Sequence, residues 1–88
     1  MDVAFRRSFE RDLKRIKDKQ VLARVAEAIR EVEAADRPEE IRHLESLSGF
    51  PGCYRIRVGS YRIGVVLEGS EVEFVRCLDR RDLYRHFP

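Results

Sequence analysis

The chain has 88 residues, of which 43% are hydrophobic and 39% are charged, and its formal net charge is +2. This length predicts one domain over residues 1–88, and no apolar run approaches the roughly 18 residues that a membrane-spanning helix needs. The opening stretch, MDVAFRRSFERD, has no apolar signal-peptide core, so we expect a cytoplasmic protein without a membrane partner. Two cysteines without CxxC spacing are too few for a disulfide framework and predict reduced thiols.

The N-terminal half predicts one strand followed by two helices. Apolar and polar residues alternate over Met1–Arg7, which is typical of a strand. Ser8 is a suitable N-cap for a first helix, whose apolar residues recur at helical spacing as far as Ile16. A tight turn over residues 17–19 then leads to a second helix over Gln20–Ala35. The expected buried stripe of this second helix is Leu22, Val25, Ala26, Ile29 and Val32.

The C-terminal half predicts three strands after a connector. The connector spans residues 38–52, and its apolar residues could form one or two helical turns. Two Gly-Ser pairs, ten residues apart, suit two-residue hairpin turns. The three strands that they join are expected at residues 53–58, 61–67 and 71–77. The tail, DRRDLYRHFP, has apolar residues four apart and predicts a short helix or an extended clip.

The first hairpin, YRIRVGSYRIG, carries three arginines on one face. A turn at Gly59-Ser60 places Arg57 opposite Arg62 and Arg55 opposite Gly64. The other face is then wholly apolar, while the bare glycine leaves an open floor beside the cations. Like charges that face each other weaken a sheet, so an anionic ligand is one candidate for compensation. An ordinary solvated strand face is the alternative interpretation.

The second hairpin extends this register to the third strand. A two-residue turn at residues 69–70 pairs Val65 with Phe74 on the apolar face. It pairs Gly64 with Val75 and Arg62 with Cys77 on the arginine face. The predicted fold class is therefore α+β, in the order β-α-α-β-β-β with a short tail. Two antiparallel N-terminal helices should cover one face of a small antiparallel sheet, opposite a shallow surface lined by arginine.

The candidate chemistry lies in the arginine-rich face. The chain has no Gly-rich phosphate loop, and neither His43 nor His86 has metal-ligand spacing with the cysteines, so we expect no metal and no cofactor. Clustered guanidiniums can stabilise the extra charge that develops when a ribose 2′-OH attacks a phosphodiester. A tyrosine can transfer a proton or stack on a splayed base. The candidate residues are Arg55, Arg57, Arg62, Arg80, Arg81 and Tyr84.

Three segments of the sequence resemble the RelE/ParE toxin superfamily, and within it the RelE-like mRNA interferases. They are SFERDLKRI, YRIRVGSYRIGVVL and DRRDLYRHF, and the likeness extends over nearly the whole chain. The resemblance implies a RelE-like microbial ribonuclease fold over residues 1–88. It also implies a toxin of a type II toxin–antitoxin pair. Such a toxin is an endoribonuclease that cleaves mRNA in the ribosomal A site and so inhibits translation. The implied partners are a cognate antitoxin protein, the ribosome and its mRNA.

The resemblance also assigns roles to individual residues. The catalytic positions that it implies are Arg55, Arg57, Arg62, Arg80 and Tyr84, with Arg81 as a neighbouring RNA-binding residue. Two departures from the family stand out. Arg55 and Arg57 replace lysines, and Asp79 replaces the histidine usual before the last conserved arginine. Because arginine does not readily carry a proton, Tyr84 becomes the expected base and the arginines act electrostatically.

Two other functions fit the same resemblance. A ParE-like protein would inhibit DNA gyrase by binding it, without cleaving RNA. A superfamily member with weak or lost activity would serve only as the partner of an antitoxin. The basic cluster together with the tail tyrosine favours the ribonuclease.

Overall fold

The computed structural model describes residues 1–88 as a five-stranded sheet with three α-helices and one 3-10 turn. The elements in chain order are β1 (Asp2–Phe5), α1 (Arg7–Arg15), α2 (Lys19–Ala34), η1 (Pro38–Glu40), β2 (Leu44–Ser46), β3 (Cys53–Val58), β4 (Tyr61–Glu68), β5 (Glu71–Asp79) and α3 (Leu83–His86). The predicted α+β fold is confirmed, and the C-terminal tail forms the short helix. No helix is long and apolar enough to cross a membrane.

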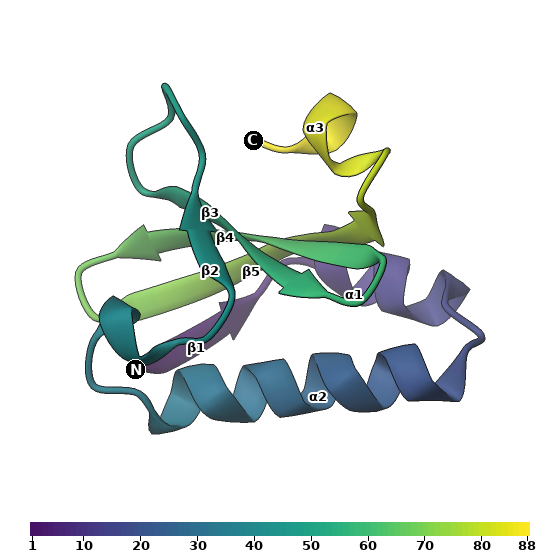
Figure 1. Cartoon of the computed structure of the whole chain (residues 1–88), viewed down its shortest axis with the longest axis horizontal. Coiled ribbons are helices and arrows are strands. Elements are labelled where there is room, and N and C mark those ends of the chain that lie inside the picture. The colour runs from purple at the N-terminus through teal and green to yellow at the C-terminus, as the bar shows by residue number, and fades with distance from the viewer.

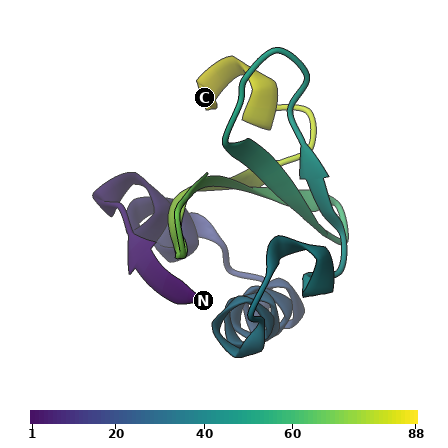
Figure 2. The same cartoon turned by 90° about the vertical axis from the view of Figure 1, so that its left-hand side faces the viewer.

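The sheet has the strand order β1-β5-β4-β3-β2 and is mostly antiparallel. Only β1 and β5 run parallel, with Val3 opposite Val72. Helices α1 and α2 lie on one side of the sheet, and α3 lies on the other side beside the loop that joins β2 to β3 (Figures 1 and 2). One side of the sheet therefore packs against the helices in the main core, and the other side carries the basic face of the β3–β4 hairpin.

Strand β2 was not predicted, because residues 38–52 were expected to form a connector with one or two helical turns. Leu44 pairs with Ile56 and Ser46 with Tyr54, so this short segment forms an edge strand. Pairing gives hydrogen-bond partners to the backbone of β3, which would otherwise be an exposed edge. Only η1 retains the helical character that was expected for this segment.

The ends of the two N-terminal helices are fixed differently. The predicted N-cap at Ser8 is wrong, because α1 begins at Arg7 and the Ser8 Oγ donates a hydrogen bond to the Val75 carbonyl oxygen. Helix α2 has a side-chain cap. The Asp18 carboxylate accepts from the Gln20 N–H at 2.9 Å, which satisfies one of the free donors of the first turn.

The main core lies between the two helices and the sheet. Its most deeply buried side chains include Phe9, Val25, Val32, Ile56, Ile63, Val65, Val72 and Phe74. Each such side chain contributes about 1.5–3 kcal/mol when it leaves water. The apolar face predicted for the hairpin strands is therefore the face that the helices cover.

The predicted register is confirmed for the first hairpin and changes partway along the second. Arg57 is opposite Arg62, and Arg55 is opposite Gly64. A bulge between Gly64 and Val65 then shifts β5 by one residue, so that Gly64 pairs with Arg76. The predicted pairs of Gly64 with Val75 and of Arg62 with Cys77 are therefore wrong.

The bulge changes the pairing and the face of the β5 residues that follow it. Cys77 pairs with Ile63 and joins the helix-side core, whereas Val75 is buried on the other side. The reason lies in α1. Its buried Asp12 carboxylate accepts hydrogen bonds from the Arg76 Nε at 2.8 Å and from the Cys77 backbone N–H at 2.9 Å. With one extra residue in β5, the Arg76 side chain and the Cys77 backbone both donate to the Asp12 carboxylate.

A second, smaller core lies on the side of the sheet that carries the basic hairpin. It consists of Leu47, Val75, Leu83 and Phe87. The open floor predicted beside the cations is wrong, because the Phe87 ring covers Gly64. A Cβ atom added at Gly64 would lie 2.6 Å from the Phe87 Cγ. The glycine is needed for the close approach of this ring, which attaches the tail to the sheet.

We predict that Gly64→Ala destabilises the protein by about 1–3 kcal/mol, because the added methyl group must displace a buried ring. Urea unfolding measures the change. In a Phe87→Ala background the ring is absent, so the same substitution should cost much less. An equal cost in both backgrounds would show that the contact with Phe87 is not the cause.

Candidate functional site

Arg55 and Tyr84 come together although they are far apart in the sequence. The Arg55 guanidinium carbon lies 5.6 Å from the centre of the Tyr84 ring, within the range of a cation–π contact. Arg55 also forms an ion pair with Glu45 of β2, with 3.4 Å between Nε and Oε1. The short edge strand thus helps to hold this arginine against the tail tyrosine. The Tyr84 side chain remains available to a ligand because the residue is 57% exposed.

Arg57 and Arg62 face each other across the hairpin, but each has a partner of its own. The Arg57 guanidinium lies 3.2 Å from the His43 Nδ1. The Arg62 guanidinium turns back and donates to the carbonyl oxygens of Gly59 and Tyr61 at 2.9 and 2.8 Å. These bonds direct the two charges to different neighbours, so relief of their repulsion does not require an anion. These partners carry no negative charge, so the positive charges of Arg57 and Arg62 remain available to an anionic ligand.

The segment after β5 places two further arginines beside the hairpin. The Arg80 backbone N–H donates to the carbonyl oxygen of Ser60 at 2.9 Å, which fixes Arg80 next to the hairpin turn. Arg81 is held by Asp79, with 3.1 Å between its Nε and the carboxylate. Hydrogen bonds from the Arg81 backbone and side chain lower the pKa of the Asp79 carboxyl. The aspartate that replaces the family's histidine thus forms an ion pair with Arg81, which was predicted to be an RNA-binding residue and not a catalytic one.

The site is consequently an incompletely neutralised group of cations. Glu45 balances Arg55 and Asp79 balances Arg81, whereas the remaining three candidate arginines have no carboxylate partner. These three are Arg57, Arg62 and Arg80. Arginine's planar, permanently charged group is well suited to bind phosphate oxygens. The arrangement can therefore bind an anion next to one exposed tyrosine.

A hollow of about 500 Å³ beside Arg55 was not predicted from the sequence. Phe50 lies on its rim and is 51% exposed, and Tyr84 lines the same hollow. An exposed phenylalanine in a Gly-Pro-rich loop was the available signal, but the loop was interpreted only as a connection. Two accessible aromatic rings beside a guanidinium provide flat surfaces of the kind on which unpaired bases stack.

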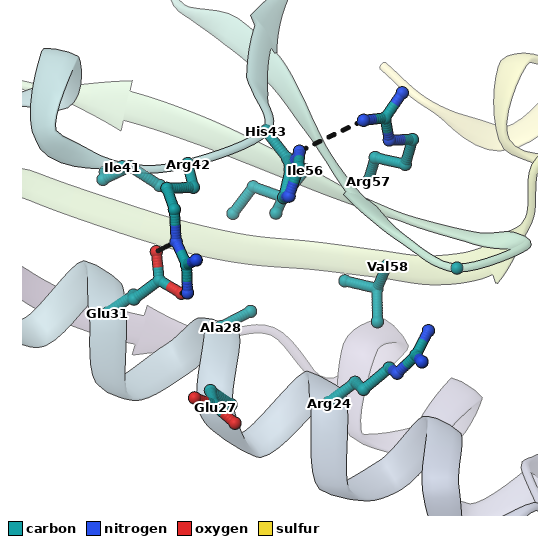
Figure 3. A pocket seen from close by; sticks show the side chains of 11 residues that line it. Arg24, Glu27, Ala28, Glu31, Ile41, Arg42, His43, Ile56, Arg57 and Val58 are labelled. Atoms are coloured by element: carbon teal, nitrogen blue, oxygen red, sulfur yellow. Dashed lines mark hydrogen bonds and ion pairs between the residues drawn. The ribbon is translucent and has the colours of Figure 1, made fainter.

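A second groove, of about 310 Å³, runs between α2 and the edge of β3 near Arg57 (Figure 3). It contains His43, for which the sequence predicted only that it has no metal-ligand spacing. No sequence signal indicates its position, because the pairing of the short β2 brings His43 beside β3. The groove also holds Arg42, which forms an ion pair with Glu31 at 2.9 Å. This ion pair lowers the pKa of the Glu31 carboxyl, chiefly through the hydrogen bond from Arg42.

The buried Cys77 does not offer a reactive thiolate. Burial raises the pKa of the Cys77 thiol to about 12, and the neighbouring Asp12 carboxylate adds to the shift. The Cys77 thiol is therefore neutral at physiological pH and packs as an apolar core group. No group of three or more His, Cys, Asp or Glu side chains is arranged to hold a metal ion.

The fold and the basic site define a small toxin of the RelE/ParE type. The model of the family described as the ParE toxin of type II toxin–antitoxin systems matches residues 3–84, and the chain belongs to this family. It is 33% identical to Toxin RelE3 of Methanocaldococcus jannaschii, over 100% of both chains. The resemblance inferred from the sequence is thereby confirmed.

Solved structures support the same assignment. The toxin–antitoxin complex RelB–RelE from Methanococcus jannaschii contains a chain with a TM-score of 0.82 and 30% identity, and the match covers 97% of this protein and 99% of that chain. The complex RelBE2 from Mycobacterium tuberculosis contains a chain with a TM-score of 0.69 and 25% identity, and 92% of each chain is covered.

Neighbouring residues on opposite faces of β3 should respond oppositely to substitution. Ile56→Ala removes a buried side chain and should destabilise the protein by about 2–5 kcal/mol. Arg57→Leu removes an exposed cation that faces Arg62, and it should leave stability equal to wild type or slightly higher. Urea unfolding of both variants measures the difference. A clear loss of stability in the Arg57 variant would mean that this arginine helps to hold the sheet together.

Proposed function

We propose that this toxin is a metal-independent endoribonuclease that cleaves mRNA in the ribosomal A site and so stops translation. The observation that supports it best is the set of three arginines without carboxylate partners, Arg57, Arg62 and Arg80, beside the Arg55–Tyr84 contact. The likeness to RelE-type toxins favours RNA as the substrate. Dependence on the ribosome is carried over from that likeness alone.

The proposed reaction is attack of a ribose 2′-OH on the neighbouring phosphorus atom. The new bond joins the 2′-oxygen to phosphorus while the bond to the 5′-oxygen breaks, giving a 2′,3′-cyclic phosphate and a 5′-hydroxyl. Arg57, Arg62 and Arg80 stabilise the charge on the pentavalent phosphate, and donors placed in advance make this effective. Arg55 holds Tyr84, and Arg81 assists in binding the RNA.

Tyr84 is the proposed proton acceptor: its phenolate form takes the proton of the attacking 2′-OH and becomes the neutral phenol. Among the site residues that the resemblance assigns, it alone is not a guanidinium, and guanidiniums do not release their protons. Its ring lies against Arg55 and is open to solvent, so a nucleotide can reach it. The 5′-oxygen takes up a proton from water as it leaves. The roles of acid–base group and base-stacking surface can be separated by substitution.

Substitutions at Tyr84 and Arg57 test the mechanism through single-turnover cleavage of mRNA on programmed ribosomes. Tyr84→Phe removes only the hydroxyl and should slow cleavage by about 10²–10⁴-fold. Tyr84→Ala also removes the ring and should weaken RNA binding in addition. Arg57→Leu removes one donor and should cost about 10²–10³ in rate. If both Tyr84 variants cleave as fast as wild type, Tyr84 is a structural residue of the tail and not the base.

A gyrase inhibitor is the second candidate, because the matching family model is that of the ParE toxins. Expression in a bacterial host separates the two functions. The ribonuclease should stop protein synthesis within minutes and leave cleaved mRNA with 2′,3′-cyclic phosphate ends. An induced DNA-damage response with intact mRNA would instead identify the gyrase inhibitor.

We also propose that a cognate antitoxin protein binds this toxin in the cell. The related chains from Methanococcus jannaschii and Mycobacterium tuberculosis occur in toxin–antitoxin complexes. The toxin exposes two phenylalanines that an apolar antitoxin segment could cover, Phe5 at 43% and Phe50 at 51% exposure. An acidic antitoxin segment would neutralise the free arginines and exclude RNA from the site.

A further inference from the structure

His43 holds Arg57 at two points from the turn that precedes β2. Its carbonyl oxygen accepts a hydrogen bond from the Arg57 backbone N–H at 3.2 Å. Its ring Nδ1 lies 3.2 Å from the Arg57 Nη2 (Figure 3). A guanidinium can only donate hydrogen bonds, so Nδ1 is the acceptor. The neutral imidazole must then carry its single proton on Nε2, which fixes the tautomer.

The backbone of His43 is also unusual. Its φ is 63°, and it is the chain's one residue other than glycine with a positive φ. The left-handed conformation costs about 1–3 kcal/mol at residues with a side chain, and it persists where surrounding contacts impose it. Here it allows the chain to enter β2 while both the carbonyl oxygen and the ring face Arg57. The strained residue is therefore the one whose carbonyl oxygen and ring both contact Arg57, a proposed catalytic cation. These two contacts are called the His43 clamp below.

No carboxylate near His43 is paired with Arg57, so the imidazole is the side chain that holds the Arg57 guanidinium in place. Helix α2 presents two carboxylates, Glu27 and Glu31, to the groove. Glu31 is taken up by Arg42, which donates to it from two nitrogens at 2.9 and 3.3 Å. Arg57 has no ion pair with any carboxylate. The titratable and charged groups that line the groove with His43 are Arg24, Glu27, Glu31, Arg42 and Arg57.

We propose that His43 is a positioning residue for RNA cleavage, which orients the Arg57 guanidinium toward the scissile phosphate. The inference rests on the proposed ribonuclease function. An arginine side chain that is ordered in advance loses less rotamer freedom when it binds the phosphate. The clamp works only with a neutral ring, because a protonated Nδ1 cannot accept a hydrogen bond and would repel the guanidinium.

Two substitutions separate the hydrogen bond from the backbone strain. Asparagine and glycine both tolerate a positive φ. In the H43N variant the amide oxygen takes the place of Nδ1 as an acceptor and does not titrate. The H43G variant keeps the backbone conformation but has no acceptor. H86N, which changes the chain's other histidine in α3, is the matched control.

The experiment is single-turnover mRNA cleavage on ribosomes at pH 8, with urea unfolding to confirm that each variant folds. H43N keeps an acceptor for the Arg57 guanidinium and should retain the wild-type rate. H43G should cleave about 10–10²-fold more slowly with unchanged KM, the range expected when a catalytic group is displaced by about 1 Å. In an Arg57→Leu background, H43G should have no further effect. H86N should behave as wild type.

An independent readout is the ¹⁵N NMR spectrum of the His43 ring, which reports the tautomer without any RNA. The clamp requires the Nε2–H tautomer at pH 8, and a proton on Nδ1 would overturn it. Equal rates for H43G and wild type, or a loss of rate in H43N as large as that in H43G, would also overturn the proposal. If the wild-type protein cleaves no mRNA at all, the ribonuclease function fails first, and the NMR result still decides whether the clamp exists.

Discussion

The hydrogen bonds of the buried Asp12 carboxylate determine how the two halves of this fold meet. Asp12 is 4% exposed and receives the Arg76 guanidinium and the Cys77 backbone N–H where β1 has ended and α1 covers the edge of β5. A buried charge without such partners would cost several kcal/mol. Both donors come directly after the extra residue of β5, where the register of the strand changes. Val75 packs with Phe87 on the other side of the sheet, and this contact attaches the tail that carries Tyr84.

The parts of the fold that could be predicted are those governed by local rules. Alternating apolar residues identified β3, β4 and β5, and the two-residue turn at Gly59-Ser60 set the register that places Arg57 opposite Arg62. The candidate arginines could be predicted for the same reason, since one register decides the face of every residue in a hairpin. Arg80 and Tyr84 were candidates by residue type, and the resemblance to RelE-like toxins assigned roles to them, but no local rule predicts that the tail folds back to the hairpin.

The features that escaped prediction depend on contacts between distant segments. An extra residue in β5 leaves no signature in the sequence, and it is stabilised by an aspartate 64 positions away. Strand β2 has only three residues, too few for alternation to be recognised. Gly64 was interpreted as open space because nothing local indicates that Phe87 covers it. His43 was dismissed because metal-ligand spacing was the criterion applied, whereas its place beside Arg57 follows from β2.

The parallel pairing of β1 with β5 has a consequence for the order in which the chain can fold during synthesis. Asp2 is opposite Glu71, so β1 leaves the ribosome with no partner until nearly seventy further residues have been made. Helices α1 and α2 and the arginine-bearing hairpin emerge before β5, the strand that lies between β1 and β4. Contacts this distant in sequence form slowly. A nascent chain therefore exposes its apolar surfaces and lacks the assembled cationic face until β5 inserts, which delays the appearance of the toxin's site relative to its translation.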